Sequence, residues 1–212
     1  MVVQVKICGL TTPETVDAAI AGGASHIGFV FFPPSPRSVS FDVARGLAAR
    51  IPEHVQKVGV FVEPCNALLE QAIESGQLDI IQVHKTPANR VAAIAAHVSR
   101  PCWAAVPVKT RADLAAAADY RGAAERILYD AKLPDNADLP GGMGVRFDWT
   151  LLSGFAHPLP WGLAGGLTPD NVAEAVRVTS ATLVDVSSGV ESAPAIKDVD
   201  KIAAFLKAAL IL

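Results

Sequence analysis

The fold class of this chain is decided by the segment Val2–Thr12, which reads Val-Val-Gln-Val-Lys-Ile-Cys-Gly-Leu-Thr-Thr. Its first seven residues are rich in β-branched and apolar side chains, as expected for a strand buried in a parallel sheet. The residues that follow, Cys8 to Thr12, lack the Gly-x-Gly-x-x-Gly turn of a dinucleotide-binding open sheet. This absence favours a closed parallel barrel, and an open doubly wound sheet is the alternative.

Similar strands recur along the whole chain, and segments with a helical period separate them. The starts of the strands lie about 26 residues apart, which suits one strand–helix unit of a small barrel. Eight units in 212 residues predict a single (β/α)8 TIM barrel that forms one domain over residues 1–212. The expected strands are Val2–Cys8, His26–Phe32, Lys57–Val62, Ile80–His84, Cys102–Val108, Arg126–Asp130, Leu159–Ala164 and Thr182–Val186.

The intervening segments show apolar stripes and start signals typical of helices. Spacing of i, i+3, i+4, i+7 and i+8 predicts two apolar helix faces. They are Cys65, Leu68, Leu69, Ala72, Ile73 and Ile202, Phe205, Leu206, Ala209, Leu210. A capping Thr followed by Pro predicts helix starts at Thr12-Pro13, Thr86-Pro87 and Thr168-Pro169. The sixth unit has the weakest pattern, with a loop at Leu133–Gly144 and a short helix near Asp148–Phe155.

Composition excludes several classes of function. The 18 Lys and Arg residues are outnumbered by 21 Asp and Glu residues, so no nucleic-acid partner is expected. Apolar runs such as Ile27–Phe32 are far shorter than the roughly 20 residues of a membrane span, and no secretory signal pattern opens the chain. Three scattered cysteines fit a reducing cytoplasm and no disulfide framework.

Catalytic groups of such barrels lie at the carboxyl ends of the strands, which makes Cys8 the first candidate. Alternation places Gln4, Lys6 and Cys8 on one strand face, expected to point into the barrel. An ammonium at Lys6 would favour the Cys8 thiolate, the form able to accept a proton. The alternative is that Cys8 is a small buried apolar residue.

Two aspartates end or approach the end of apolar strands. Asp130 closes its strand, and partial desolvation would raise its pKa toward a value useful for an acid. A solvated loop aspartate near Lys132 is the alternative. Asp185 lies amid apolar neighbours and therefore needs a partner, which is Lys6, an amide or a substrate group.

Glycines and serines follow the seventh and eighth strands, where these barrels commonly bind phosphate. Gly165-Gly166 and Ser187-Ser188-Gly189 supply small residues that let a ligand approach the backbone closely. Ordinary turns are the alternative. Arg37 lies in a loop with three prolines, Phe32-Pro33-Pro34-Ser35-Pro36-Arg37, and such a fixed guanidinium suits a carboxylate ligand. A surface arginine is the alternative.

The remaining candidates are assigned structural or minor roles. His84 ends the fourth strand but no second histidine shares that end of the barrel, so no metal is expected. Cys65 is expected on an apolar helix face and Cys102 at the inert end of the barrel, both as structural residues. Glu63 is expected to be a solvated loop residue.

The chain resembles the phosphoribosylanthranilate isomerase family in motifs that span nearly its whole length. The first and last of these motifs are highly specific when they occur together. The matching stretches are Lys6–Thr11, Gly28–Phe31 with Pro36–Ser38, Val58–Val62, Gln82–His84, Gly165–Leu167 and Val184–Glu191.

The resemblance implies a (β/α)8 barrel that isomerises a phosphorylated ribosyl substrate by an Amadori rearrangement in tryptophan biosynthesis. It implies Cys8 as general base, Asp130 as general acid and Arg37 as the ligand of the anthranilate carboxylate. The phosphate is implied at Gly165, Gly166, Ser187, Ser188 and Gly189, with His84 and Asp185 completing the substrate-binding set. The implied partner is the small-molecule substrate of a cytoplasmic monomer or homodimer, with no cofactor or metal.

Three positions depart from the family pattern. Lys85 stands where the family usually has Gly, Ala104 lies in a fifth strand without its frequent lysine, and Ala131 replaces a small hydroxyl residue. Two other functions remain open at this point. They are another phosphate-sugar barrel enzyme, such as an epimerase, and a barrel that binds a phosphorylated ligand without catalysis.

Overall fold

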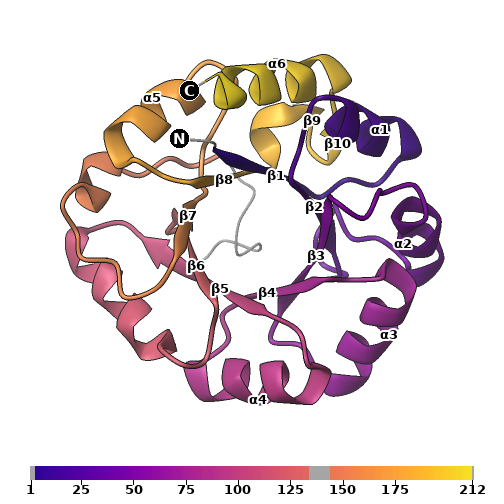
Figure 1. Ribbon diagram of the computed structural model, residues 1–212, viewed down its shortest axis with the longest axis horizontal. Helices are drawn as coiled ribbons and strands as arrows, with labels where there is room; N and C mark the ends of the chain where they lie inside the picture. The colour runs from indigo at the N-terminus through magenta and orange to yellow at the C-terminus, as the bar shows by residue number, and fades with distance from the viewer. Residues whose placement is uncertain (1–2, 134–143, 212) are drawn as a thin grey trace.

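A computed structural model describes residues 3–133 and 144–211 and contains the closed parallel barrel predicted from the sequence. Figure 1 looks down the barrel axis, with the strands inside and the helices around them. The eight strands pair in chain order, and the first closes the barrel against the eighth. They are β1 (Gln4–Cys8), β2 (His26–Val30), β3 (Gln56–Val62), β4 (Ile80–His84), β5 (Cys102–Val108), β6 (Arg126–Ala131), β7 (Trp161–Leu163) and β8 (Leu183–Val186).

The helices cover the outer face of the barrel (Figure 1). In the described ranges, none of them has the length and apolarity that crossing a membrane requires. The α-helices are α1 (Pro13–Ala21), α2 (Phe41–Ala48), α3 (Asn66–Gly76), α4 (Ala88–Val98), α5 (Val172–Thr179) and α6 (Val199–Leu210). The 3-10 helices are η1 (Arg111–Tyr120), η2 (Trp149–Leu152) and η3 (Ser188–Val190).

Only the first of the three predicted Thr-Pro helix starts is confirmed. Thr12 caps α1 and accepts a hydrogen bond from the Thr15 amide, and Pro13 is the first helical residue. Thr86 instead donates its hydroxyl hydrogen to the His84 carbonyl, so it forms part of a turn before α4. Thr168-Pro169 also belongs to a turn, because α5 begins only after Asn171.

The two predicted apolar stripes are correct except at one end of each. Cys65 is the exposed N-cap of α3, because the helix begins only at the next residue. Leu210 is the last residue of α6 and is 41% exposed. Leu69 and Phe205 illustrate the residues between these ends that pack as predicted, since both are fully buried.

The sixth unit is the least regular, as the sequence predicts. Its helix is the four-residue η2, which lies within the predicted Asp148–Phe155 segment. Of the predicted loop Leu133–Gly144, residues 134–143 lie outside the described residues.

Side chains fill the barrel in two apolar layers. The layer nearer the amino ends of the strands contains Val58, Ile80, Trp103, Leu128 and Leu183. The layer nearer the carboxyl ends contains Cys8, Val30 and Val60, with Phe32 packed against it. A larger apolar cluster joins the outer strand faces to the helices.

A two-stranded hairpin after the eighth strand adds to the basic barrel. It consists of β9 (Glu191–Ala193) and β10 (Ile196–Lys197), which pair antiparallel. The hairpin follows β8 and η3 directly, so it starts at the carboxyl end of the barrel, where the candidate site lies.

Gly28 gives a direct test of packing inside the barrel. A Cβ at this position would lie 3.0 Å from the Cys8 Sγ and 3.1 Å from the Lys6 Cε. We expect Gly28→Ala to lower the free energy of unfolding by about 1–3 kcal/mol, because overpacking forces neighbours out of place. Urea denaturation measures this change.

The matched control is Gly46→Ala in α2, where a Cβ meets nothing within 4 Å. There, alanine should stabilise the helix by roughly 0.5–1 kcal/mol. Equal stability of Gly28→Ala and the parent protein would contradict the packing described here.

Candidate active site

A cavity at the carboxyl ends of the strands brings together the predicted site residues. Its lining also includes an apolar wall from β2, β3 and β6, formed by Val30, Val60, Val62 and Leu128. The predicted residues that line it are Cys8, Arg37, His84, Asp130, Gly165, Gly166, Asp185, Ser187, Ser188 and Gly189.

A buried ion pair lies beneath the cavity. The Lys6 Nζ donates to both carboxylate oxygens of Asp185, at 2.9 Å each. The two residues are also direct register partners in β1 and β8, so the pair spans the seam that closes the barrel. This contact settles the partner of Asp185 within the protein, because a carboxylate among apolar neighbours needs a cation.

Cys8 lies above Lys6 and is buried. Burial raises the pKa of its thiol, and the Asp185 carboxylate acts in the same direction. The Lys6 ammonium lowers this pKa, as the sequence suggests, but its effect is smaller than that of burial. The expectation that Lys6 favours the thiolate is therefore confirmed in direction, but burial outweighs it and the pKa of the thiol is raised overall.

Asp130 provides a carboxyl group with an unusually high proton affinity. Burial, followed by repulsion from the Asp185 carboxylate, raises the pKa of Asp130 to about 7. The expected effect of desolvation is confirmed. The Asp130 Oδ1 accepts a 2.8 Å hydrogen bond from the Ala131 amide. Because this donor is the backbone, the alanine that replaces the family's usual hydroxyl residue keeps the contact.

His84 contributes a neutral ring to the cavity. Burial, the Lys6 ammonium and Lys85 lower the pKa of His84 to about 4. Its Nε2 lies 3.2 Å from the Gln82 Nε2, so the amide can donate to the unprotonated ring nitrogen. Lys85 adopts a φ of 52°, a left-handed conformation that explains why glycine is usual at this position. In the described ranges no three His, Cys, Asp or Glu side chains are placed to hold a metal ion.

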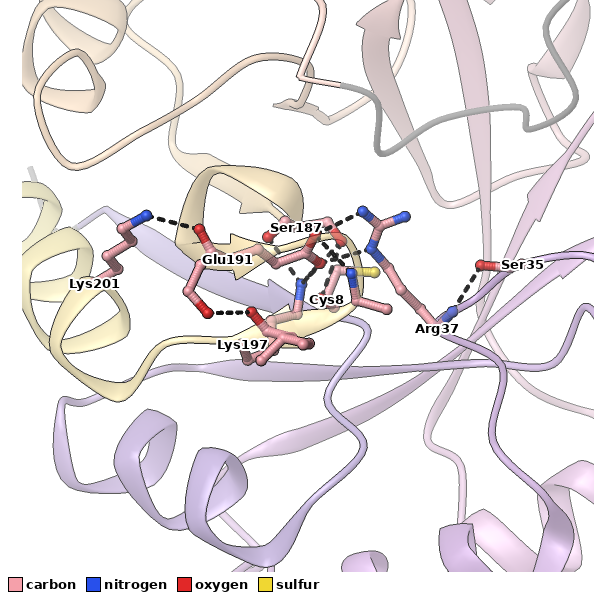
Figure 2. Close-up of polar contacts among 10 residues, drawn as sticks. Cys8, Ser35, Arg37, Ser187, Glu191, Lys197 and Lys201 are labelled. Atoms are coloured by element: carbon pink, nitrogen blue, oxygen red, sulfur yellow. Dashed lines mark hydrogen bonds and ion pairs between the residues drawn. The ribbon is translucent and has the colours of Figure 1, made fainter.

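Arg37 reaches the cavity from the proline-rich loop and is itself buried. Its Nε and Nη2 donate to the two carboxylate oxygens of Glu191, at 2.7 and 2.8 Å. Lys197 approaches the same carboxylate, and Figure 2 shows both cations converging on Glu191 beside Cys8. One bidentate edge of the Arg37 guanidinium is therefore held by a carboxylate of the protein, a contact that the sequence did not predict.

In the loops after β7 and β8, close contacts within the protein leave room only for glycine at two positions. A Cβ on Gly166, where φ is 64°, would lie 2.8–2.9 Å from Arg146. A Cβ on Gly189 would lie 1.8 Å from the Leu167 carbonyl oxygen. From the sequence we expected these glycines to let a ligand approach the backbone closely. In the structure, they let neighbouring loops of the protein approach each other. Bulky substitutions at these positions would therefore disturb the loops themselves.

Sequence reasoning missed Gln82, Glu191 and Lys197 as parts of the site. Gln82 and Glu191 lie within family motifs but carried no assigned role, and Lys197 lies in the short strand β10. A glutamine within an otherwise apolar strand is unusual, and this pattern could have indicated a functional role for Gln82. Only the fold brings Glu191 to Arg37, because 154 residues separate them in the chain.

Comparison with known proteins identifies close relatives over the full chain. A sequence model of the N-(5'phosphoribosyl)anthranilate (PRA) isomerase family matches residues 5–208. The N-(5'-phosphoribosyl)anthranilate isomerase of Zymomonas mobilis subsp. mobilis is 53% identical over 214 aligned residues, covering 100% of both chains. The enzyme of the same name from Paramagnetospirillum magneticum is 53% identical and covers 99% of this chain and 98% of its own.

Two solved structures have the same barrel. A phosphoribosyl anthranilate isomerase in complex with reduced 1-(o-carboxyphenylamino)-1-deoxyribulose 5-phosphate has a TM-score of 0.86 and 35% identity. The enzyme from Thermotoga maritima has a TM-score of 0.88 and 36% identity. Each comparison covers 99% of this chain and 100% of the other.

The raised pKa of Asp130 has a consequence for stability. Above about pH 7 the folded protein holds a carboxylate that burial disfavours, whereas in the unfolded chain the group ionises near its ordinary pKa of about 4. We expect Asp130→Asn to raise the melting temperature, because the amide carries no charge. The gain should be absent at pH 4, grow up to about pH 7 and then stay constant. A gain that does not change with pH would contradict the raised pKa.

Proposed function

Because this chain belongs to the N-(5'-phosphoribosyl)anthranilate isomerase family, an enzyme family of tryptophan biosynthesis, we propose that Cys8 and Asp130 are its base and acid. The substrate is N-(5'-phosphoribosyl)anthranilate and the product is 1-(2-carboxyphenylamino)-1-deoxyribulose 5-phosphate. The observation that carries the assignment is that both groups face one cavity, where burial raises the pKa of Asp130 to about 7.

The rearrangement needs an acid first. Protonated Asp130 donates its proton to the ring oxygen of the ribose, and the bond from that oxygen to C1 breaks. The nitrogen lone pair forms a C1=N double bond, which gives an open-chain Schiff base with a positive charge on nitrogen. A carboxyl group with a pKa near the working pH is an efficient donor for this step.

A base completes the isomerisation. The Cys8 thiolate takes the proton from C2, the electrons of that bond form C1=C2, and the C1=N electrons return to nitrogen. The resulting enolamine loses the proton of its C2 hydroxyl and gains a proton at C1, which leaves the ketone. The sum is an isomerisation, so the proposed steps use proton transfer and call for no cofactor or metal.

The cavity offers a separate surface for each part of the substrate. The apolar wall of Val30, Val60 and Leu128 suits the aromatic ring. We place the anthranilate carboxylate at Arg37, and polar contacts to the sugar at His84 and Asp185. We place the phosphate at the loops after β7 and β8, with Gly165, Gly166, Ser187, Ser188 and Gly189 around it.

We extend the proposal to the setting of the enzyme. Residues 1–212 form one domain, and the enzyme works in the cytoplasm, as the three free cysteines support. It acts as a monomer or homodimer, and one structural relative from Thermotoga maritima is described as dimeric. Size-exclusion chromatography with light scattering distinguishes the two states.

A pair of cysteine variants tests the base. We expect Cys8→Ala to lower kcat by at least about 10²-fold, within the range that proton transfer by a positioned group contributes. Cys65→Ala should leave kcat unchanged, because Cys65 is exposed at the start of α3. Loss of substrate fluorescence measures turnover. Unchanged turnover in Cys8→Ala would favour another base, and no turnover in the parent would favour a barrel that only binds.

The acid is tested by the pH dependence of kcat/KM. The active form holds a protonated Asp130 and a Cys8 thiolate, although the pKa of the thiol is the higher of the two. As pH increases, kcat/KM should rise up to about pH 7 and then flatten. Above that pH, further gain of thiolate is offset by loss of protonated Asp130.

In Asp130→Asn the rate should be at least about 10²-fold lower and should keep rising through pH 7, since no acid is left to ionise. A bend near pH 7 that persists in this variant would assign the titration to another group. A normal kcat with a raised KM would make Asp130 a binding residue.

A further inference from the structure

The Arg37 guanidinium is held in a fixed orientation by Glu191. Two parallel hydrogen bonds of 2.7 and 2.8 Å connect the Nε and Nη2 of Arg37 to the two oxygens of Glu191. Both side chains are less than 8% exposed. A bidentate contact of this kind fixes the plane of the guanidinium as well as its position.

Lys197 binds the same carboxylate, at the oxygen that also accepts from the Arg37 Nε. Its Nζ donates to the Glu191 Oε1 at 2.7 Å, and the Lys197 side chain is 1% exposed. Burial opposes the charge on Glu191, but hydrogen bonds from Arg37 and Lys197 outweigh it and hold the pKa of Glu191 below its ordinary value. The Glu191 carboxylate is thus ionised between two cations. We refer to Arg37, Glu191 and Lys197 as the ion triad.

The ion triad is also connected, through Ser187, to Cys8 at the end of β1. Lys197 Nζ donates to the Ser187 carbonyl at 2.8 Å and to the Ser187 Oγ at 3.1 Å. The Ser187 hydroxyl in turn donates to the Cys8 carbonyl at 3.2 Å. As Figure 2 shows, the β9–β10 hairpin therefore connects Arg37, the loop after β8 and the backbone of Cys8.

We propose that Glu191 and Lys197 are positioning residues for the isomerase, with Glu191 aiming Arg37 at the substrate carboxylate and Lys197 fixing Ser187 relative to Cys8. The proposal rests on the proposed function. A buried ion pair often contributes little net stability compared with apolar packing. The orientation that a fixed guanidinium imposes on a planar carboxylate ligand gives these buried charges a role in specificity.

Glu191→Gln is the central variant, because the amide keeps the shape but loses the charge and one acceptor. We expect kcat/KM for the anthranilate substrate to fall about 10- to 100-fold, mainly through KM, as a charged hydrogen bond to the substrate is misdirected. For the corresponding phosphoribosyl aniline, which lacks the carboxylate, the fall should be less than about threefold. The difference between substrates is the coupling of a double-mutant cycle.

Asp17→Asn is the matched control. Asp17 holds the Nε and Nη2 of Arg50 in the same bidentate arrangement, but on the exposed surface. This variant should leave kcat/KM for both substrates unchanged.

Lys197→Met separates the two ends of the ion triad. It removes the contacts to Ser187 as well as to Glu191, so kcat/KM should fall for both substrates. If Glu191→Gln fails to fold, Glu191→Asp replaces it. The shorter side chain keeps the negative charge but moves the carboxylate away from the Arg37 guanidinium. The same loss confined to the carboxylate substrate is expected.

The outcomes separate this inference from the proposed function. A parent enzyme without isomerase activity would contradict the proposed function. The inference would be overturned if the parent is active but the Glu191 variant loses kcat/KM equally on both substrates and has a lowered melting temperature. That result would show a merely structural role. Unchanged kinetics on both substrates would overturn it as well.

Discussion

The buried Lys6–Asp185 ion pair is the contact on which the active cavity depends. It joins the first and last strands of the barrel and places one ammonium and one carboxylate beneath the proposed catalytic residues. Removing one partner of such a pair costs about 3–5 kcal/mol, because an uncompensated charge stays buried. Gly28 leaves the space that the Lys6 side chain occupies, so the packing of the second strand also serves this pair.

The two carboxyl groups of the cavity have different partners. Asp185 has a cation within 2.9 Å, whereas Asp130 has one backbone amide and the repulsion of Asp185. Burial and this repulsion raise the pKa of Asp130 to about 7.

The sequence predicted what depends on local pattern. Apolar strand runs gave the eight strands in order, and the rule that catalytic groups follow the strands placed Cys8, Asp130 and Arg37 in one cavity. Effects that depend on distant contacts could not be predicted. Burial outweighs the influence of Lys6 on Cys8, and Glu191 meets Arg37 only through the fold.

Some local predictions also failed, for an instructive reason. Thr168-Pro169 has the residues of a helix start, but the Thr168 amide donates to the Asn171 Oδ1 in a turn, and α5 begins only after Asn171. A local hydrogen bond between a side chain and the backbone therefore competes with the helix-capping signal of Thr168.

The proposed acid role of Asp130 depends on burial raising its pKa into the neutral range, so that a protonated form can donate. Carbon-13 NMR of aspartate-labelled protein measures this pKa directly, with Asp130→Asn identifying the carboxyl resonance. We expect a titration with a midpoint near pH 7. A midpoint near pH 4, the ordinary value for an aspartate, would contradict it.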